Sequence, residues 1–120
     1  MNNDNFYITT PIYYPSGTPH MGHAYSSIFA DVFARFKRND NYNVFFLTGT
    51  DEHGLKIQKA AEKSNSEPLE YCDKISKVFK DLTKKLNLSN DDFIRTTEKR
   101  HHEAVNDLWN KLLNSGDIYL

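Results

Sequence analysis

Cysteine is almost absent from this sequence of 120 residues, in which Cys72 is the single example. One thiol excludes a disulfide within the chain and a zinc site built from several cysteines, and it fits a reducing compartment. An excess of one charge is lacking too: 15 Lys and Arg stand against 16 Asp and Glu, which leaves no net field to attract nucleic acid or an anionic membrane. Because no apolar run approaches membrane-spanning length and the first five residues are polar, we expect a cytoplasmic protein with no signal peptide and no membrane contact.

The composition is that of a folded domain. Hydrophobic residues make up 38% of the chain, with seven tyrosines and eight phenylalanines, and 120 residues suffice for one domain with a buried core. The last three residues, Ile118–Leu120, favour a strand that nothing follows. We therefore expect a fragment of a longer polypeptide.

Strand and helix patterns alternate along the sequence. Strands are expected at residues 6–10, 42–48 and 93–96, with another beginning at Ile118, and helices at about 20–38, 55–63, 68–88 and from about 97 to Gly116. This alternation predicts the α/β class, a Rossmann-like parallel sheet flanked by helices. Apolar residues that recur at helical spacing in the helix at 20–38 are expected to pack on the sheet: Ala24, Ile28, Val32 and Phe36, with Phe29 and Phe33 beside them.

The tetrapeptide His20–His23 (His-Met-Gly-His) lies where a proline-rich loop meets the helix at 20–38. A helix start offers free N–H groups and the positive end of the helix dipole, which suit a phosphate. Gly22 has no β-carbon and lets a nucleotide come close to the backbone. His20 and His23 are three residues apart, so they share one face and can donate to the same ligand. The competing interpretation is a capped helix whose histidines bond to nearby loop carbonyls.

A second polar loop, Gly49–Gly54 (Gly-Thr-Asp-Glu-His-Gly), leaves the carboxyl end of the strand at 42–48. Parallel sheets bind ligands at these ends, so the loop and His20–His23 are expected to meet at one crevice. A solvated polar turn is the plainer alternative for Asp51–His53. His101 and His102 point apart on a helix, and no metal site or zinc site is expected within this segment.

These motifs resemble the amino-terminal catalytic half-fold of class I aminoacyl-tRNA synthetases, whose first signature His20–His23 matches. Three further stretches are similar to the methionine-specific members: Thr9–Pro15, Thr48–Gly54 and Asp91–Thr97. Pro15–Gly17 is also similar to leucine-specific members, but those are expected to carry a tryptophan-containing loop where Asp51–Gly54 stands. The resemblance covers nearly the whole chain.

The resemblance implies a methionine–tRNA ligase, which activates methionine with ATP to methionyl-adenylate and transfers the methionyl group to tRNA(Met) in protein synthesis. It implies ATP binding by His20, Gly22 and His23, with His20 and His23 as the catalytic residues. It implies methionine binding by Ile12, Tyr14, Asp51 and His53, with Asp51 receiving the ammonium group. Mg²⁺ would accompany the phosphates of ATP rather than occupy a protein cage.

Other parts of that family are missing from residues 1–120. These are the second signature (lysine, methionine, serine, lysine, serine), the connective insert with its zinc knuckle, and the anticodon-binding domain. We therefore expect residues 1–120 to be the amino-terminal part of the nucleotide-binding catalytic domain and to be inactive alone. The sequence leaves the oligomeric state open.

Two other interpretations remain at this point. A His-x-Gly-His motif also occurs in small nucleotidyltransferases that adenylylate a phosphate ester and are close to this chain in length. In such an enzyme the chain would be complete and Asp51 would bind no amine. The third interpretation is a catalytically inactive domain that binds nucleotide or a partner.

Overall fold

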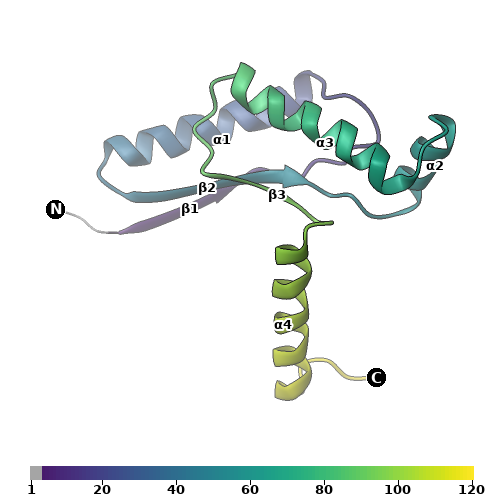
Figure 1. The fold of residues 1–120 in the computed structure, drawn as a ribbon. Helices are drawn as coiled ribbons and strands as arrows, with labels where there is room; N and C mark the ends of the chain where they lie inside the picture. The colour runs from purple at the N-terminus through teal and green to yellow at the C-terminus, as the bar shows by residue number, and fades with distance from the viewer. Residues whose placement is uncertain (1–3) are drawn as a thin grey trace.

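The computed structural model describes residues 4–120 and shows a parallel sheet with helices packed on one face (Figure 1). The three strands lie in the order β1 (Asn5–Thr9), β2 (Asn43–Thr50) and β3 (Asp92–Arg95). Both neighbouring pairs are parallel, with Tyr7 opposite Phe45 and Thr48 opposite Phe93. The predicted α/β class with a Rossmann-like sheet is confirmed. Met1, Asn2 and Asn3, on which the expected absence of a signal peptide partly rests, lie outside the described residues.

Within residues 4–120, four helices connect and follow the strands: α1 (Met21–Asn39), α2 (Leu55–Lys63), α3 (Pro68–Lys85) and α4 (Lys99–Ser115). α1 and α3 lie over the same face of the sheet, and α2 lies beside its carboxyl end (Figure 1). α4 projects away on the opposite side and buries no residue. In the described part of the chain, no helix is long and apolar enough to cross a membrane.

The face of α1 that packs on the sheet differs from the predicted one. The buried residues of this helix are small or polar: Ser27, Ala30, Asp31 and Ala34. Ala30 and Ala34 let the helix approach the sheet closely enough to contact Phe46 of β2, which is fully buried. The bulky residues are left on the outer face, where they are between 43% and 61% exposed: Ile28, Phe29, Val32, Phe33 and Phe36. Helical spacing alone was therefore a wrong guide to the packed face.

A second buried cluster joins the loop before α1 to α3 and β3. It consists of Tyr13, Phe79 and Phe93, with Ile75 packed against it. The rings of Tyr13 and Phe79 stack with centroids 5.6 Å apart, and the Tyr13 hydroxyl shares a hydrogen bond of 2.8 Å with Ser27. Tyr13 thus anchors the proline-rich loop in the core.

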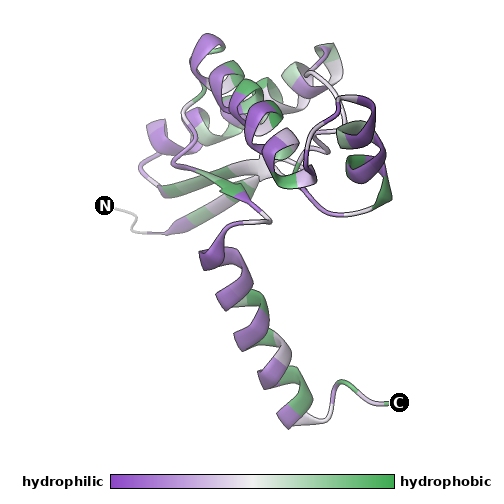
Figure 2. Cartoon of the chain, turned by 45° about the vertical axis from the view of Figure 1, so that its right-hand side comes forward, coloured by the Kyte–Doolittle hydropathy of each residue, from purple (hydrophilic) through white to green (hydrophobic). Residues whose placement is uncertain are grey.

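The strand predicted to begin at Ile118 is not formed. α4 ends at Ser115, and Gly116 follows with a φ of 82°, in the left-handed region that favours glycine. Because α4 leads the chain away from the sheet, Ile118 meets no strand edge with which to pair. Figure 2 shows hydrophobic positions along one side of α4. The large hydrophobic residues of this helix are exposed: Val105, Leu108, Trp109, Leu112 and Leu113.

Candidate functional site

Two loops from different strands meet at the carboxyl end of the sheet. Tyr13, in the loop after β1, forms a parallel bridge with Thr50 of β2. The Tyr13 N–H donates to the Gly49 carbonyl, and the Asp51 N–H donates to the Tyr13 carbonyl, both at 2.9 Å. The Tyr13 ring in turn contacts His23, with centroids 4.9 Å apart. One residue therefore connects the Asp51 loop to the start of α1.

The start of α1 is capped by its own two histidines. The backbone of His20 is extended, and its Nδ1 accepts a hydrogen bond of 3.0 Å from the Gly22 N–H. The Nδ1 of His23 accepts one of 3.0 Å from the His20 N–H, which completes a reciprocal capping box. The histidines thus bond to backbone N–H groups rather than to loop carbonyls. Because both Nδ1 atoms accept, each neutral ring carries its proton on Nε2, which is left as a donor.

The two imidazoles lie close together at the positive end of the helix. Their centroids are 3.9 Å apart. Burial lowers the pKa of His23 below its ordinary value, and the neighbouring His20 lowers it further. The described first turn of α1 holds no acidic residue, so nothing there opposes a bound anion. The arrangement offers two ring N–H donors beside a helix N-terminus, which suits a phosphate group.

Glycine is needed at position 22 for a structural reason that the sequence did not reveal. A β-carbon at this position would lie 2.9 Å from Cε1 and 3.1 Å from Nδ1 of the His20 ring. The glycine therefore makes room for the capping ring itself. The same absence of a side chain leaves the backbone accessible at the helix start.

Burial alternates along the loop after β2: Asp51 is half-buried, Glu52 is 4% exposed and His53 is exposed. The Glu52 carboxylate accepts hydrogen bonds from Thr50, Arg95 and Thr97. Burial alone would raise the pKa of Glu52, but these hydrogen bonds, led by that from Arg95, hold it below its ordinary value. Sequence reasoning missed Glu52 as a fixed point of this loop. No local signal marks it, because its partner Arg95 lies 43 residues away in the sequence.

Tyr14 and His53, both predicted to bind the same ligand, are in contact. The Tyr14 hydroxyl donates a hydrogen bond of 2.6 Å to the His53 carbonyl. The His53 Nδ1 lies 3.0 Å from the Thr96 hydroxyl, which also accepts from the Glu52 N–H at 2.8 Å. Gly54 follows with a φ of 105°, and a β-carbon there would lie 2.8 Å from the Tyr14 hydroxyl. The fourth predicted residue of this set, Ile12, is 42% exposed in the loop after β1.

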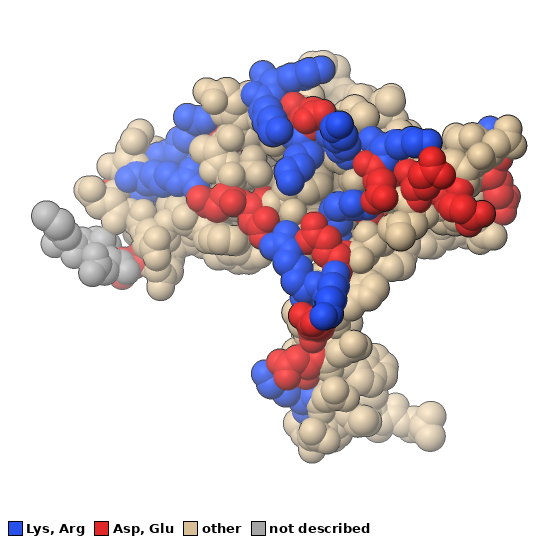
Figure 3. All heavy atoms as spheres, viewed as in Figure 1, with Lys and Arg blue, Asp and Glu red and all other residues tan. Residues whose placement is uncertain are grey.

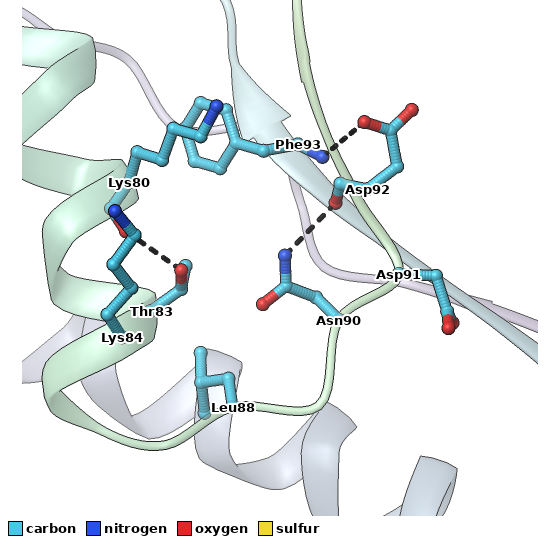
Figure 4. Close-up of a pocket in the computed structure, with 8 residues that line it drawn as sticks. All are labelled: Lys80, Thr83, Lys84, Leu88, Asn90, Asp91, Asp92 and Phe93. Carbon is cyan, nitrogen blue, oxygen red and sulfur yellow. Dashed lines mark hydrogen bonds between the residues drawn. The ribbon is translucent and has the colours of Figure 1, made fainter.

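A cavity of about 390 Å³ lies beside this loop, lined in part by Glu52, His53 and Gly54. A second pocket, of about 310 Å³, lies where β3 begins, between Lys80 and Lys84 of α3 and the chain near Asn90 (Figure 4). This second pocket contains none of the predicted site residues. Both signs of charge are interspersed on the surface, with Lys and Arg prominent over α3 (Figure 3).

Cys72 and the pair His53 and His102 are not part of the histidine-capped start of α1. Burial, followed by the charge of Glu52, raises the pKa of the Cys72 thiol to about 11, so Cys72 is an unreactive buried thiol. The rings of His53 and His102 have centroids 6.0 Å apart. Within residues 4–120, however, no three His, Cys, Asp or Glu residues are grouped to hold a metal ion.

A parallel α/β sheet with a His-x-Gly-His helix start at its carboxyl end is the arrangement expected of a class I tRNA synthetase. The family model described as tRNA synthetases class I (M) matches residues 6–120, and the chain belongs to this family. It is 57% identical over 118 residues to Methionine--tRNA ligase 1 of Bacillus cereus. This match covers 98% of this chain and 18% of that protein. This membership sets aside the small nucleotidyltransferases.

The similarity to solved structures agrees with this family assignment. The chain is similar to a Mycobacterium tuberculosis methionyl-tRNA synthetase in complex with methionyl-adenylate, with a TM-score of 0.92 and 49% identity over 97% of this chain and 23% of that one. It is less similar to an Agrobacterium radiobacter LeuRS–tRNA–LeuAMS ternary complex, with a TM-score of 0.86 and 25% identity over 99% of this chain and 16% of that one. The chain thus spans about a fifth of the length of the methionine-specific relatives it matches.

Proposed function

We propose that residues 1–120 are the amino-terminal part of the catalytic domain of a methionine–tRNA ligase. One observation carries the proposal: Tyr13 bonds to the Asp51 N–H through its carbonyl and contacts His23 through its ring. Asp51, which would bind an amine, and the start of α1, which would bind a phosphate, therefore lie on the two sides of Tyr13. Methionine and ATP carry those two groups. Membership of the class I (M) family supports the same substrates.

In this proposal His20, Gly22 and His23 bind ATP. The Nε2–H groups of the two histidines donate to phosphate oxygens, and the exposed backbone at Gly22 faces the nucleotide. Charge that develops on the transferring phosphate is stabilised by donors already in place, each contributing about 3 kcal/mol. His20 and His23 are therefore the catalytic residues.

Methionine binds at the other side of the crevice. Asp51 receives the ammonium group, Tyr14 and Ile12 contribute to the pocket for the side chain, and His53 lies beside them. A charge-assisted hydrogen bond between carboxylate and ammonium fixes the orientation of the amino acid. This orientation brings the methionine carboxylate toward the phosphates at the start of α1.

The reaction is an in-line displacement. A carboxylate oxygen of methionine attacks the α-phosphorus of ATP, the new C–O–P linkage forms, and the bond to the leaving pyrophosphate breaks. No covalent bond to the protein is needed, because positioning and charge stabilisation suffice. Transfer of the methionyl group to the terminal ribose of tRNA(Met) follows and requires parts of the enzyme beyond residues 1–120.

Mg²⁺ enters with ATP, bound through the phosphates, and the protein works in the cytoplasm without membrane contact. These points stay predictions from the sequence and the family resemblance. Magnesium binds phosphate oxygens and water in preference to a full protein cage, and this fits the described first turn of α1, which holds no acidic residue.

The test is ATP–pyrophosphate exchange by the full-length protein that carries these residues. Exchange is expected with methionine and not with leucine or with a phosphopantetheine-like acceptor. Turnover of the acceptor in place of methionine would contradict the proposal. Nucleotide binding without exchange would indicate an inactive binding domain.

A further inference from the structure

We propose that Glu52 and Arg95 form a positioning pair that holds the loop after β2 so that Asp51 and His53 face the proposed methionine site. The inference rests on the proposed function in one respect, namely that the ligand received by Asp51 is the ammonium group of methionine. Glu52 and Arg95 themselves touch no substrate in this scheme. They act through the backbone of the loop.

Glu52 is the buried and fully bonded member of the pair, whereas Arg95 is partly exposed. The Glu52 side chain is 0% exposed, and Arg95 donates to it twice, from Nε to Oε1 at 2.7 Å and from Nη2 to Oε2 at 2.8 Å. Thr50 and Thr97 add hydrogen bonds of 2.7 and 2.5 Å. Such a bidentate contact fixes the plane of the carboxylate as well as its position. A buried carboxylate that accepts four hydrogen bonds cannot move without losing them, so the position of the Glu52 side chain is fixed.

Arg95 connects three elements of the fold. It belongs to β3, it bonds to the loop after β2 through Glu52, and its Nη2 bonds to Asp73 of α3 at 2.6 Å. The hydrogen bonds that Arg95 donates to Glu52 and Asp73 raise the pKa of Arg95, so the guanidinium stays charged at every working pH. The loop is thereby fastened to two rigid elements rather than to another loop.

The constraint reaches Asp51 and His53 through the backbone on the two sides of Glu52. On the Asp51 side the Glu52 N–H donates to Thr96, and on the other side the His53 carbonyl accepts from the Tyr14 hydroxyl, so the backbone is held on both sides of the buried carboxylate. With Glu52 turned inward, its two neighbours are turned outward, as their greater exposure shows. A misplacement of about 1 Å at a substrate-positioning group costs on the order of 100-fold in rate, which makes such fastening worthwhile.

The decisive experiment uses Glu52→Gln in the full-length protein, which keeps the shape of the side chain and removes its charge. The KM for methionine in pyrophosphate exchange is expected to rise about 10- to 100-fold, because the loop loses its fixed position. The KM for ATP is expected to stay within about twofold, since the start of α1 is held by its own capping box. A general loss of stability would instead lower the maximal exchange rate, through the amount of folded enzyme, and would leave both KM values near those of wild type.

Arg38→Gln is the matched control. Arg38 also makes an ion pair, with Asp91 at 2.7 Å, but at the far end of the sheet. This variant is expected to leave both KM values unchanged. Because the removal of one partner from a buried pair is costly, Glu52→Gln risks not folding. Asp73→Asn then weakens the same pair from its exposed end, and a rise of several-fold in the methionine KM is expected.

Deuterium uptake of the amides at residues 51–54, measured by mass spectrometry, supplies a readout that needs no substrate. Uptake is expected to increase in Glu52→Gln and Asp73→Asn and to match wild type in Arg38→Gln. Unchanged uptake, or a methionine KM equal to that of wild type, would overturn the inference. If the wild-type protein shows no methionine-dependent exchange, the proposed function fails, and the uptake still decides whether the pair holds the loop.

Discussion

The hydroxyl of Tyr14 donates a hydrogen bond of 2.6 Å to the carbonyl of His53, across 39 residues of sequence. This bond joins the loop after β1 to the loop after β2 at the proposed methionine site. The two loops otherwise meet through the backbone of Tyr13, in the core below. The Tyr14–His53 bond therefore fixes the outer rim of the site.

Tyr14→Phe removes this bond and keeps the aromatic ring. A hydrogen bond worth about 1 kcal/mol corresponds to a rise of about fivefold in the KM for methionine, which steady-state pyrophosphate exchange measures. Tyr25→Phe is the control, because Tyr25 is 72% exposed on α1. Equal methionine KM values in the two variants would show that the Tyr14 hydroxyl has no part in the site.

Gly54→Ala places a side chain where the backbone has a φ of 105° and where the Tyr14 hydroxyl lies 2.8 Å from the new atom. The strain is expected to cost about 1–3 kcal/mol, seen as a lower melting temperature in scanning calorimetry. Gly17→Ala is the control, since a β-carbon at Gly17 has no neighbour within 4 Å. A melting temperature unaffected by Gly54→Ala would contradict the described loop conformation.

His20 combines a capping role with the proposed phosphate contact, and two substitutions separate them. Asn is a good N-cap, so His20→Asn is expected to keep the stability of α1, whereas His20→Ala loses about 1 kcal/mol. Both remove the Nε2–H donor and are expected to lower the exchange rate by about 100-fold. Calorimetry and exchange assays give the two readouts. Full exchange activity in His20→Asn would assign His20 to capping alone.

His23 predicts a specific pH dependence. Burial and the nearby His20 lower its pKa in the folded protein, so the unfolded chain binds more protons as the pH falls below the ordinary value of 6.5. The contribution of neutral His23 to the free energy of unfolding is complete above pH 6.5, and it is lost as the pH falls through the pKa of His23 in the folded protein. Melting temperatures measured from pH 7 to pH 5 are expected to fall less in His23→Gln, which keeps a capping side chain at this position. An identical pH profile in the variant would contradict this assignment.

The sequence predicted the elements well because their signals are local. Strand composition, proline and glycine positions and apolar spacing placed β2, α2 and the other elements close to where the structure has them. The meeting of the two loops followed from one general rule, that ligands lie at the carboxyl ends of parallel strands.

Features that depend on distant neighbours were missed or wrong. The packed face of α1 is set by how closely Ala30 and Ala34 allow Phe46 to approach, which helical periodicity does not encode. Glu52 looked like part of a polar turn, because its partner Arg95 is 43 residues away. The strand expected at Ile118 is not formed, because residues that favour a strand also need a neighbouring strand edge to pair with.

The most direct test of the account is the methionine KM of Asp51→Asn in pyrophosphate exchange by the full-length protein. A charge-assisted hydrogen bond worth about 1.5–3 kcal/mol predicts a methionine KM raised about 10- to 100-fold, with the ATP KM nearly unchanged. If Asp51→Asn exchanges with wild-type constants, Asp51 does not receive the ammonium group and the proposed site is wrong.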